Sequence, residues 1–167
     1  MRAVGIILAG GNSNKMRELT HKRAVAAMPI AGSYRAIDFA LSNMSNSHIQ
    51  KVAVLTQYNA RSLNEHLNSS KWWDFGRKQG GLYVFTPTIT AENGYWYRGT
   101  ADAIYQNLDF LKRCHEPYVI ITSGDAVYKM DYNKVLEYHI AKKQILQLFV
   151  KNLVRTKMRA VSEQSNE

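Results

Sequence analysis

Ala3-Val4-Gly5-Ile6-Ile7-Leu8-Ala9-Gly10-Gly11 is the stretch that decides the fold of this chain. Its short, continuous apolar run predicts a strand that is buried on both faces, as strands in parallel sheets are. The paired glycines predict a tight loop, because a residue without Cβ lets the backbone approach a ligand closely. Successive backbone N–H groups in such a loop bind anions, so a phosphate is the expected guest; an ordinary structural turn explains the glycines equally well.

Strand-like and helix-like patterns alternate along the rest of the chain. Further strands are predicted at 51–57, 81–87 and 118–125, and helices at 34–47, 61–68, 100–111 and 133–142, with Thr100 as a helix N-cap. Such alternation is typical of an α/β fold, and we expect a three-layer sandwich with a mainly parallel sheet of Rossmann-like type.

Polar residues stand where two of these predicted strands end. Gln57 ends the second strand, and Asp125 follows a Ser-Gly pair at the end of the fourth. Ligands of open α/β sheets bind beyond the carboxyl ends of the strands, so Gln57 is well placed to contact one. A carboxylate at this edge is where a magnesium ligand is expected, although Asp125 is equally explained as a turn or capping residue.

Composition narrows the possible functions of this chain of 167 residues. Cys114 is its one cysteine, no apolar run approaches membrane-spanning length, and no signal peptide is recognisable, so we expect a cytoplasmic protein that does not contact a membrane. The net charge of +9 permits nucleic-acid binding, but the basic residues are scattered in pairs at most. A cleft for nucleotide phosphates or a solvated basic surface accounts for the charge, and we expect no nucleic-acid partner.

Five ordered sequence blocks carry a resemblance to a known family. They are Leu8-Ala9-Gly10-Gly11; Tyr34-Arg35-Ala36-Ile37-Asp38-Phe39 with Leu41-Ser42-Asn43; Val54-Leu55-Thr56-Gln57-Tyr58; Trp96-Tyr97-Arg98-Gly99-Thr100-Ala101-Asp102-Ala103; and Ser123-Gly124-Asp125 with Tyr128-Lys129-Met130-Asp131-Tyr132. Over residues 1 to about 143, the chain resembles the amino-terminal part of the glucose-1-phosphate adenylyltransferase (ADP-glucose pyrophosphorylase) family, whose fold is that of nucleotide-diphospho-sugar transferases.

This resemblance implies a chemistry and a set of site residues. Glucose 1-phosphate attacks the α-phosphorus of ATP, pyrophosphate leaves, ADP-glucose forms for glycogen synthesis, and Mg²⁺ neutralises the developing charge. By resemblance, Gly10 and Gly11 approach the nucleotide phosphates and Asp125 holds the metal. The other residues that the resemblance implies are Gln57, Tyr97, Gly99 and Thr100 for nucleotide binding and Lys15 and Arg23 as catalytic cations.

Three departures from the family pattern argue against full catalysis. Lys15 stands where family enzymes carry an arginine, Val25 replaces the lysine of their Arg-Ala-Lys-Pro-Ala motif, and Ala126 replaces the histidine of Gly-Asp-His. Each charged contact in a transition state is worth several kcal/mol. The pattern resembles the regulatory or non-catalytic subunit that accompanies a catalytic adenylyltransferase subunit in some Gram-positive bacteria. A catalytic enzyme and an inert truncation product remain the alternatives.

The last residues differ from the family in another way. Where the family continues with a strand like Ala-Asp-Ile-Thr-Val-Val, this chain reads Gln144-Ile145-Leu146-Gln147-Leu148-Phe149. Loss of the first base from GCA GAT ATT ACA GTT GTT yields codons for Gln-Ile-Leu-Gln-Leu-Phe. We therefore expect residues 1–143 to be an incomplete nucleotidyltransferase-like domain whose carboxyl part is missing. Residues 144–167 are expected to be a frame-shifted tail, with a makeshift edge strand at 145–150 and a disordered end.

Overall fold

The computed structural model describes residues 2–11, 14–68, 73–75, 80–88, 94–151 and 158–161, and of residues 14, 15, 149–151 and 158–161 it describes the backbone alone. The chain divides into two compact units, Met1–Asp131 and Tyr132–Glu167. The expectation of a disordered end falls on residues that lie outside the described part.

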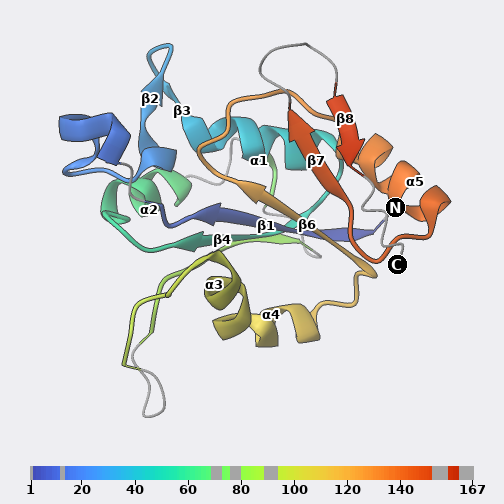
Figure 1. Ribbon diagram of the computed structural model, residues 1–167. Coiled ribbons are helices and arrows are strands. Elements are labelled where there is room, and N and C mark those ends of the chain that lie inside the picture. Colours follow the sequence, from blue (N-terminus) through green and yellow to red (C-terminus); the bar gives the residue numbers. More distant parts are fainter. Residues whose placement is uncertain are drawn as a thin grey trace. The chain divides into compact units, whose positions relative to one another are not determined.

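A four-stranded parallel sheet forms the centre of the first unit (Figure 1). Its strands are β1 (Ala3–Ala9), β4 (Lys51–Thr56), β5 (Gly81–Phe85) and β6 (Tyr118–Ser123), in the order β5-β4-β1-β6. In register, Ile6 of the central strand β1 faces Ala53 of β4 and Ile121 of β6. The prediction of a mainly parallel sheet from four apolar runs is confirmed.

Helices cover both faces of this sheet, as the three-layer prediction requires. Figure 1 shows α1 (Ala36–Asn46) and α2 (Arg61–Leu67) on one side, and α3 (Thr100–Gln106) and α4 (Leu108–Arg113) on the other. Between β1 and α1, the chain forms the short helices η1 (Asn14–Thr20) and η2 (Val25–Ala27) and a small antiparallel hairpin of β2 (Pro29–Ile30) with β3 (Tyr34–Arg35).

The core follows from the alternation of side chains along the strands. On one face, Ile7, Val52 and Val54 are fully buried together with the apolar side of α1. On the other face, Ile6 and Leu55 pack with Tyr97 and Ala103. Both faces of the two inner strands, β1 and β4, are therefore buried. This explains why their sequences are continuous apolar runs and do not alternate between apolar and polar residues.

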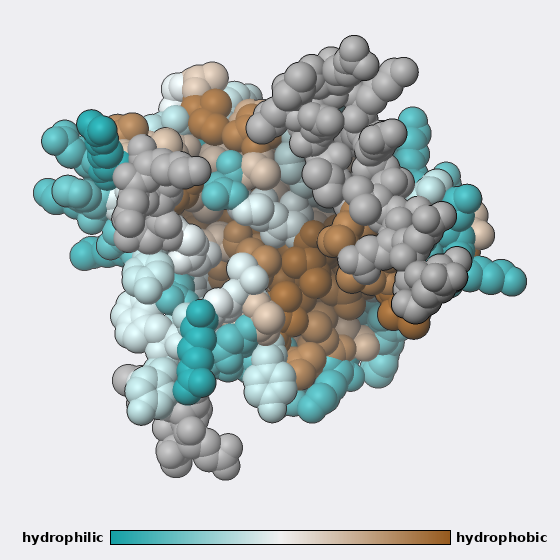
Figure 2. Space-filling model, viewed as in Figure 1, coloured by the Kyte–Doolittle hydropathy of each residue, from teal (hydrophilic) through white to brown (hydrophobic). Residues whose placement is uncertain are grey.

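The edge strand β6 is less well covered than the inner strands. Val119 and Ile121, which face the same side of the sheet as Ile6, remain 44% and 51% exposed. Figure 2 shows apolar side chains gathered at the centre of the face on which Figure 1 places β6. The apolar pattern of this strand thus predicted its strand conformation correctly but not the burial of its side chains.

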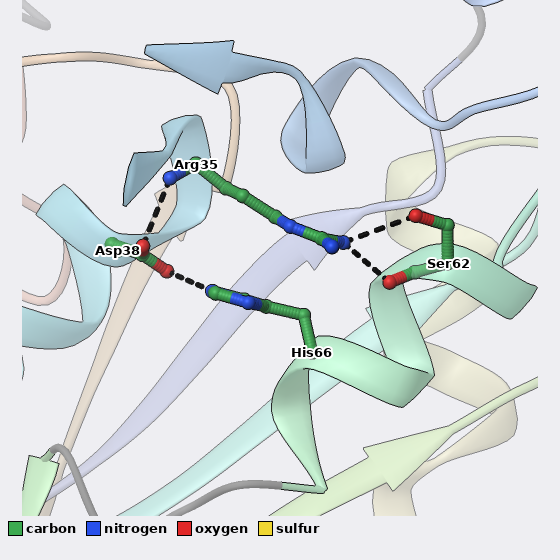
Figure 3. A network of polar contacts seen from close by, with 4 residues as sticks. All are labelled: Arg35, Asp38, Ser62 and His66. Carbon is green, nitrogen blue, oxygen red and sulfur yellow. Dashed lines mark hydrogen bonds and ion pairs between the residues drawn. The ribbon is translucent and has the colours of Figure 1, made fainter. Parts of the chain in front are cut away.

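A polar network joins the amino-terminal end of α1 to α2 (Figure 3). Asp38 accepts a hydrogen bond from the backbone N–H of Arg35 at 2.9 Å, closing the first turn of α1, and lies 2.6 Å from His66 Nε2. The guanidinium of Arg35 donates to the backbone carbonyl and the hydroxyl of Ser62. Because Asp38 is buried, its contacts with Arg35 and His66 supply the hydrogen-bond partners that a buried carboxyl needs, and the network ties α1 to α2.

The helix expected over 100–111 is interrupted, and its expected N-cap is wrong. Gly99 occupies the N-cap position and Thr100 is the first helical residue. The interruption occurs at Asn107, whose side-chain amide donates to the Ala103 carbonyl at 2.8 Å and to the Tyr97 hydroxyl at 3.0 Å. Apolar residues continue at helical spacing across this break, so periodicity gave no sign of it.

The second unit contains α5 (Tyr132–Lys142) and a hairpin of β7 (Leu148–Lys151) with β8 (Met158–Val161). β7 pairs with β8 in a separate two-stranded sheet, whereas the sequence predicted an edge strand from residue 145. Within the part of the chain that the structure describes, no helix has the length and apolar character needed to cross a membrane.

Lys51 and Glu116 form a half-buried ion pair with an N···O distance of 2.9 Å. The hydrogen bond to Glu116 raises the pKa of Lys51. Burial opposes the charge of Glu116, but the hydrogen bond and charge of Lys51, together with backbone hydrogen bonds from Glu116 and His115, outweigh it and lower the pKa of Glu116. The contribution of Glu116 to stability is therefore present above its unfolded pKa of about 4.3 and is lost as the pH falls through the lower folded pKa.

Replacing Lys51 by methionine is expected to lower the free energy of unfolding at pH 7 by about 1 kcal/mol, because Glu116 loses its donor. Since protonated Glu116 no longer needs a cation, the difference from wild type should shrink once the pH falls below about 4. Urea unfolding at pH 7 and pH 3 measures both values. Arg61→Met, which breaks the exposed Arg61–Glu65 pair, should change little, and an equal loss in the two variants would contradict the prediction.

Candidate functional site

The carboxyl ends of β1, β4 and β6 meet at one edge of the sheet, because the three strands are parallel neighbours. Gly10 and Gly11 follow β1, Gln57 follows β4, and Asp125 follows β6 after one further residue. Each of these residues therefore starts a loop at the same edge. The convergence is a direct consequence of the parallel order β4-β1-β6.

Close packing explains one of the two glycines. A Cβ on Gly10 would lie 3.1 Å from Cβ of Gln57, which is tighter than ordinary side-chain contacts. A Cβ on Gly11 would meet nothing within 4 Å. Gly10 thus permits the approach of the loops after β1 and β4, whereas Gly11 leaves backbone open at the edge where a ligand would bind.

Tyr97 connects the segment before α3 to this edge. Gln57 Nε2 donates to the Tyr97 carbonyl at 3.3 Å, and the Tyr97 hydroxyl accepts from Asn107. Burial raises the pKa of the Tyr97 phenol, the hydrogen bond from Asn107 lowers it, and nearby Asp102 adds to the rise. Tyr97 is therefore a neutral, buried anchor at physiological pH.

Two further contacts shape the start of α3. The carboxylate of Asp102, in the first turn of the helix, accepts from the backbone N–H of Arg98 at 2.8 Å. Just outside this turn, the rings of Tyr58 and Trp96 stack with centroids 5.5 Å apart. Together these contacts hold the 94–99 segment against the end of β4.

Asp125 is exposed, and its carboxylate accepts a hydrogen bond from the hydroxyl of Ser123. Within the described ranges, no group of three or more His, Cys, Asp or Glu side chains is arranged to hold a metal ion. Mg²⁺ in nucleotide sites is commonly held by one or two carboxylates together with substrate phosphates and water. Among the described residues, the exposed carboxylate of Asp125 would fit that mode, in which phosphates and water complete the coordination.

These residues border one cleft of about 480 Å³, within the range of ligand sites for small molecules. The side chains and backbone that line it are those of Leu8, Ala9, Gly10, Gly11, Val25, Ala26, Leu55, Gln57, Tyr58, Tyr97, Arg98, Gly99, Thr100, Ala103, Ser123 and Asp125. The cleft brings together Asp125 and all six residues that the sequence assigned to nucleotide binding.

Of the two expected catalytic cations, Arg23 does not line this cleft, and the side chain of Lys15 cannot be compared with it. Arg23 is exposed and borders a separate cavity of about 400 Å³, together with Lys22 and His21. The side chain of Lys15 lies outside the described part of the chain. Among the described residues that line the cleft, Arg98 carries the positive charge, and its guanidinium lies over the Tyr95 ring at 5.8 Å.

Sequence reasoning did not assign Tyr58 and Arg98 to the site. Both adjoin residues that were assigned, Gln57 and Tyr97, so their positions in the chain were a usable signal. Val25 also lines the cleft, and it is the residue that replaces the lysine of the family pattern. A larger cavity of about 640 Å³ shares Tyr97 and Arg98 with the cleft and is otherwise bordered by mostly polar residues of 86–88 and 102–112.

The chain is similar in sequence to known glucose-1-phosphate adenylyltransferases. The glucose-1-phosphate adenylyltransferase of Thermosipho africanus is 49% identical over 139 residues, which are 83% of this chain and 34% of that protein. Those of Clostridium perfringens strain SM101 and of Bacillus cytotoxicus are 50% and 48% identical over the same share of this chain. The chain thus spans about a third of the length of these relatives.

A family model described as nucleotidyl transferase matches residues 4–158. The match covers the parallel sheet from Val4 onward and every residue that lines the cleft. It also continues past residue 143, so the sequence boundary expected there stays a prediction. On this match, together with the four-stranded parallel sheet, the chain belongs to the nucleotidyl transferase family.

Proposed function

We propose that this chain binds ATP with Mg²⁺ in the cleft and acts in glycogen synthesis as a regulatory, non-catalytic subunit of a glucose-1-phosphate adenylyltransferase. The observation that carries the proposal is the convergence of Gly10, Gly11, Gln57, Gly99, Thr100 and Asp125 on one cleft. The relatives are named for transfer of an adenylyl group to glucose 1-phosphate, which supports ATP and a sugar phosphate as the ligand class. The resemblance stated above supports a catalytic adenylyltransferase subunit as the partner.

Each group in the cleft has a distinct task in this proposal. The backbone after β1 approaches the phosphates, because Gly11 offers no side chain to block them. The Gln57–Tyr97 hydrogen bond fixes the wall that borders the base. Asp125 provides the carboxylate for Mg²⁺, which when bound neutralises phosphate charge.

The lining of the cleft supports a weakly catalytic role. Val25, half-buried in the wall, presents an apolar side chain where the family pattern places an ammonium. Catalysis of group transfer between phosphates depends mainly on positioned charge, so this loss reduces transition-state stabilisation. Efficient pyrophosphorolysis of ADP-glucose by the purified chain alone would refute the regulatory assignment.

A thermal melt with and without millimolar ATP and Mg²⁺ tests the binding site. A ligand that binds the folded state alone stabilises it, by about 2.7 kcal/mol at a hundredfold excess over the dissociation constant. The wild-type midpoint should rise, and Asp125→Asn should abolish the Mg²⁺-dependent part of the rise. Asp109→Asn, the same change outside the cleft, should retain it. If Asp125→Asn kept the full rise, Asp125 would not be the metal ligand.

Restoring the family lysine should strengthen nucleotide binding. Val25→Lys places an ammonium beside the expected triphosphate, and we expect the dissociation constant for Mg²⁺–ATP to fall about tenfold, or about 1.4 kcal/mol. Isothermal titration calorimetry measures the constant. Val119→Lys adds the same charge on β6 outside the cleft and should change it little. Equal gains in both variants would show general attraction of ATP to a basic protein.

A further inference from the structure

The loop that carries Asp125 is closed by a hydrogen bond between its two ends. The hydroxyls of Thr122, near the end of β6, and Tyr128 lie 2.6 Å apart. Between them, the backbone N–H of Gly124 donates to the Leu8 carbonyl at 2.9 Å, which fixes the start of the loop to β1. Asp125 thus lies in the middle of a loop that leaves β6 after Ser123 and returns to contact β6 at Tyr128.

A buried asparagine of α1 holds the outgoing side of the same loop. Asn43, 5% exposed, donates from Nδ2 to the Tyr128 carbonyl at 2.9 Å and accepts from the Met130 N–H at 3.1 Å. The NH₂ group and the oxygen of this amide both bond to backbone groups of the loop, much as a neighbouring strand would. Because unpaired buried amides are costly, this contact fixes where the loop leaves the sheet.

Thr122, Tyr128 and Asn43 do not line the cleft, whereas Asp125 does. The carboxylate of Asp125 is exposed and accepts a hydrogen bond from Ser123, two residues earlier, so its position depends on the segment that bears both residues. We propose that Tyr128, with Thr122 and Asn43, is a positioning residue that sets Asp125 at the distance from the Gly10-Gly11 backbone needed for metal-bound nucleotide. This inference rests on the proposed function. Sites of this kind require their ligating groups to be held within about 0.5 Å.

Binding of Mn²⁺–ATP, followed by electron paramagnetic resonance of the metal, tests this role without an activity assay. Tyr128→Phe removes one oxygen and keeps the ring, so the protein should fold, while its dissociation constant for Mn²⁺–ATP should rise about threefold to tenfold. Thr122→Val should raise the dissociation constant equally. The double variant should bind Mn²⁺–ATP as well as either single variant, since each of the three proteins lacks the same Thr122–Tyr128 hydrogen bond. Thr122→Ser, which keeps the hydroxyl, should bind like wild type, as should Tyr34→Phe at an exposed tyrosine outside the loop.

Calorimetry with ATP in excess chelator provides the second readout. A positioning role predicts unchanged metal-free ATP affinity in Tyr128→Phe, because the Gly10-Gly11 backbone is untouched. Equal weakening with and without metal would overturn the positioning role, and so would wild-type affinity for Mn²⁺–ATP in Tyr128→Phe. In either case the proposed function would stand. Wild-type protein that binds no Mn²⁺–ATP would overturn the proposed function and the positioning role together.

Discussion

Replacing Leu41 by alanine is expected to lower the free energy of unfolding by about 3–4 kcal/mol. Leu41 is 0% exposed in the middle of α1, where it is buried with Ile37 and Met44 at helical spacing. Removing its side chain forfeits both the transfer of apolar surface from water and the contacts of the atoms around the new cavity. Equilibrium urea unfolding, with the slope constrained to a common value, measures the change.

The chain offers a matched control for this substitution. Leu19 lies in η1 and is 61% exposed, so Leu19→Ala removes the same atoms without opening a cavity. We expect it to change stability by less than about 0.5 kcal/mol. If Leu41→Ala were equally mild, the interface between α1 and the sheet would be less tightly packed than the structure shows.

Valine at position 124 is expected to destabilise the protein by about 3 kcal/mol and to abolish nucleotide binding. A Cβ on Gly124 would lie 3.2 Å from Cβ of Ala9 and from Cγ2 of Ile7, and 3.3 Å from Cβ of Ala26. Two of these three atoms are attached directly to backbone, so they cannot rotate away. The two further methyl groups of valine must displace β1, η2 or the loop that carries Asp125.

Gly94→Val is the control for Gly124→Val. Among the described residues, a Cβ on Gly94 meets nothing within 4 Å, whereas the one on Gly124 is crowded, so the comparison isolates the effect of that crowding. Thermal melts of both variants, each with and without ATP and Mg²⁺, separate the loss of stability from the loss of binding. A Gly124→Val protein that melts like wild type would show that the close contact around Gly124 relaxes easily.

Most of the sheet was predictable from sequence because burial on both faces leaves a clear mark. The runs at Ala3–Ala9 and Lys51–Thr56 are almost entirely apolar, and the structure places both in the interior. The break at Asn107 was not predictable, since the apolar spacing continues across it and the Asn107 side chain bonds to Tyr97, ten residues earlier in the chain. The local pattern of apolar residues thus indicates which face of a segment is buried, but not the individual side-chain contacts found where a helix is interrupted.

The same distinction holds for the site. Gly10, Gln57 and Asp125 were predictable as neighbours because parallel strands bring their carboxyl ends to one edge. The contrast between Arg23, which is exposed, and Val25, which lines the cleft, was not, because the short helix η2 that begins at Val25 was not predicted. The contact of Asn43 with Tyr128 joins positions 85 residues apart and left no mark in either local sequence.

The central position of β1 in the sheet affects how the protein folds during its synthesis on the ribosome. Val4 pairs with Lys51 of β4 on one side and with Val119 of β6 on the other. The first strand to be synthesised therefore lacks its second neighbouring strand until β6 has been made. At cellular rates of synthesis, β6 emerges on the order of 10 s after β1. During that interval the apolar segment Ala3–Ala9 has a partner on one edge at most. Nascent chains paused between β4 and β6 should therefore engage chaperones that recognise apolar segments, and release from them should coincide with the emergence of Tyr118–Ser123.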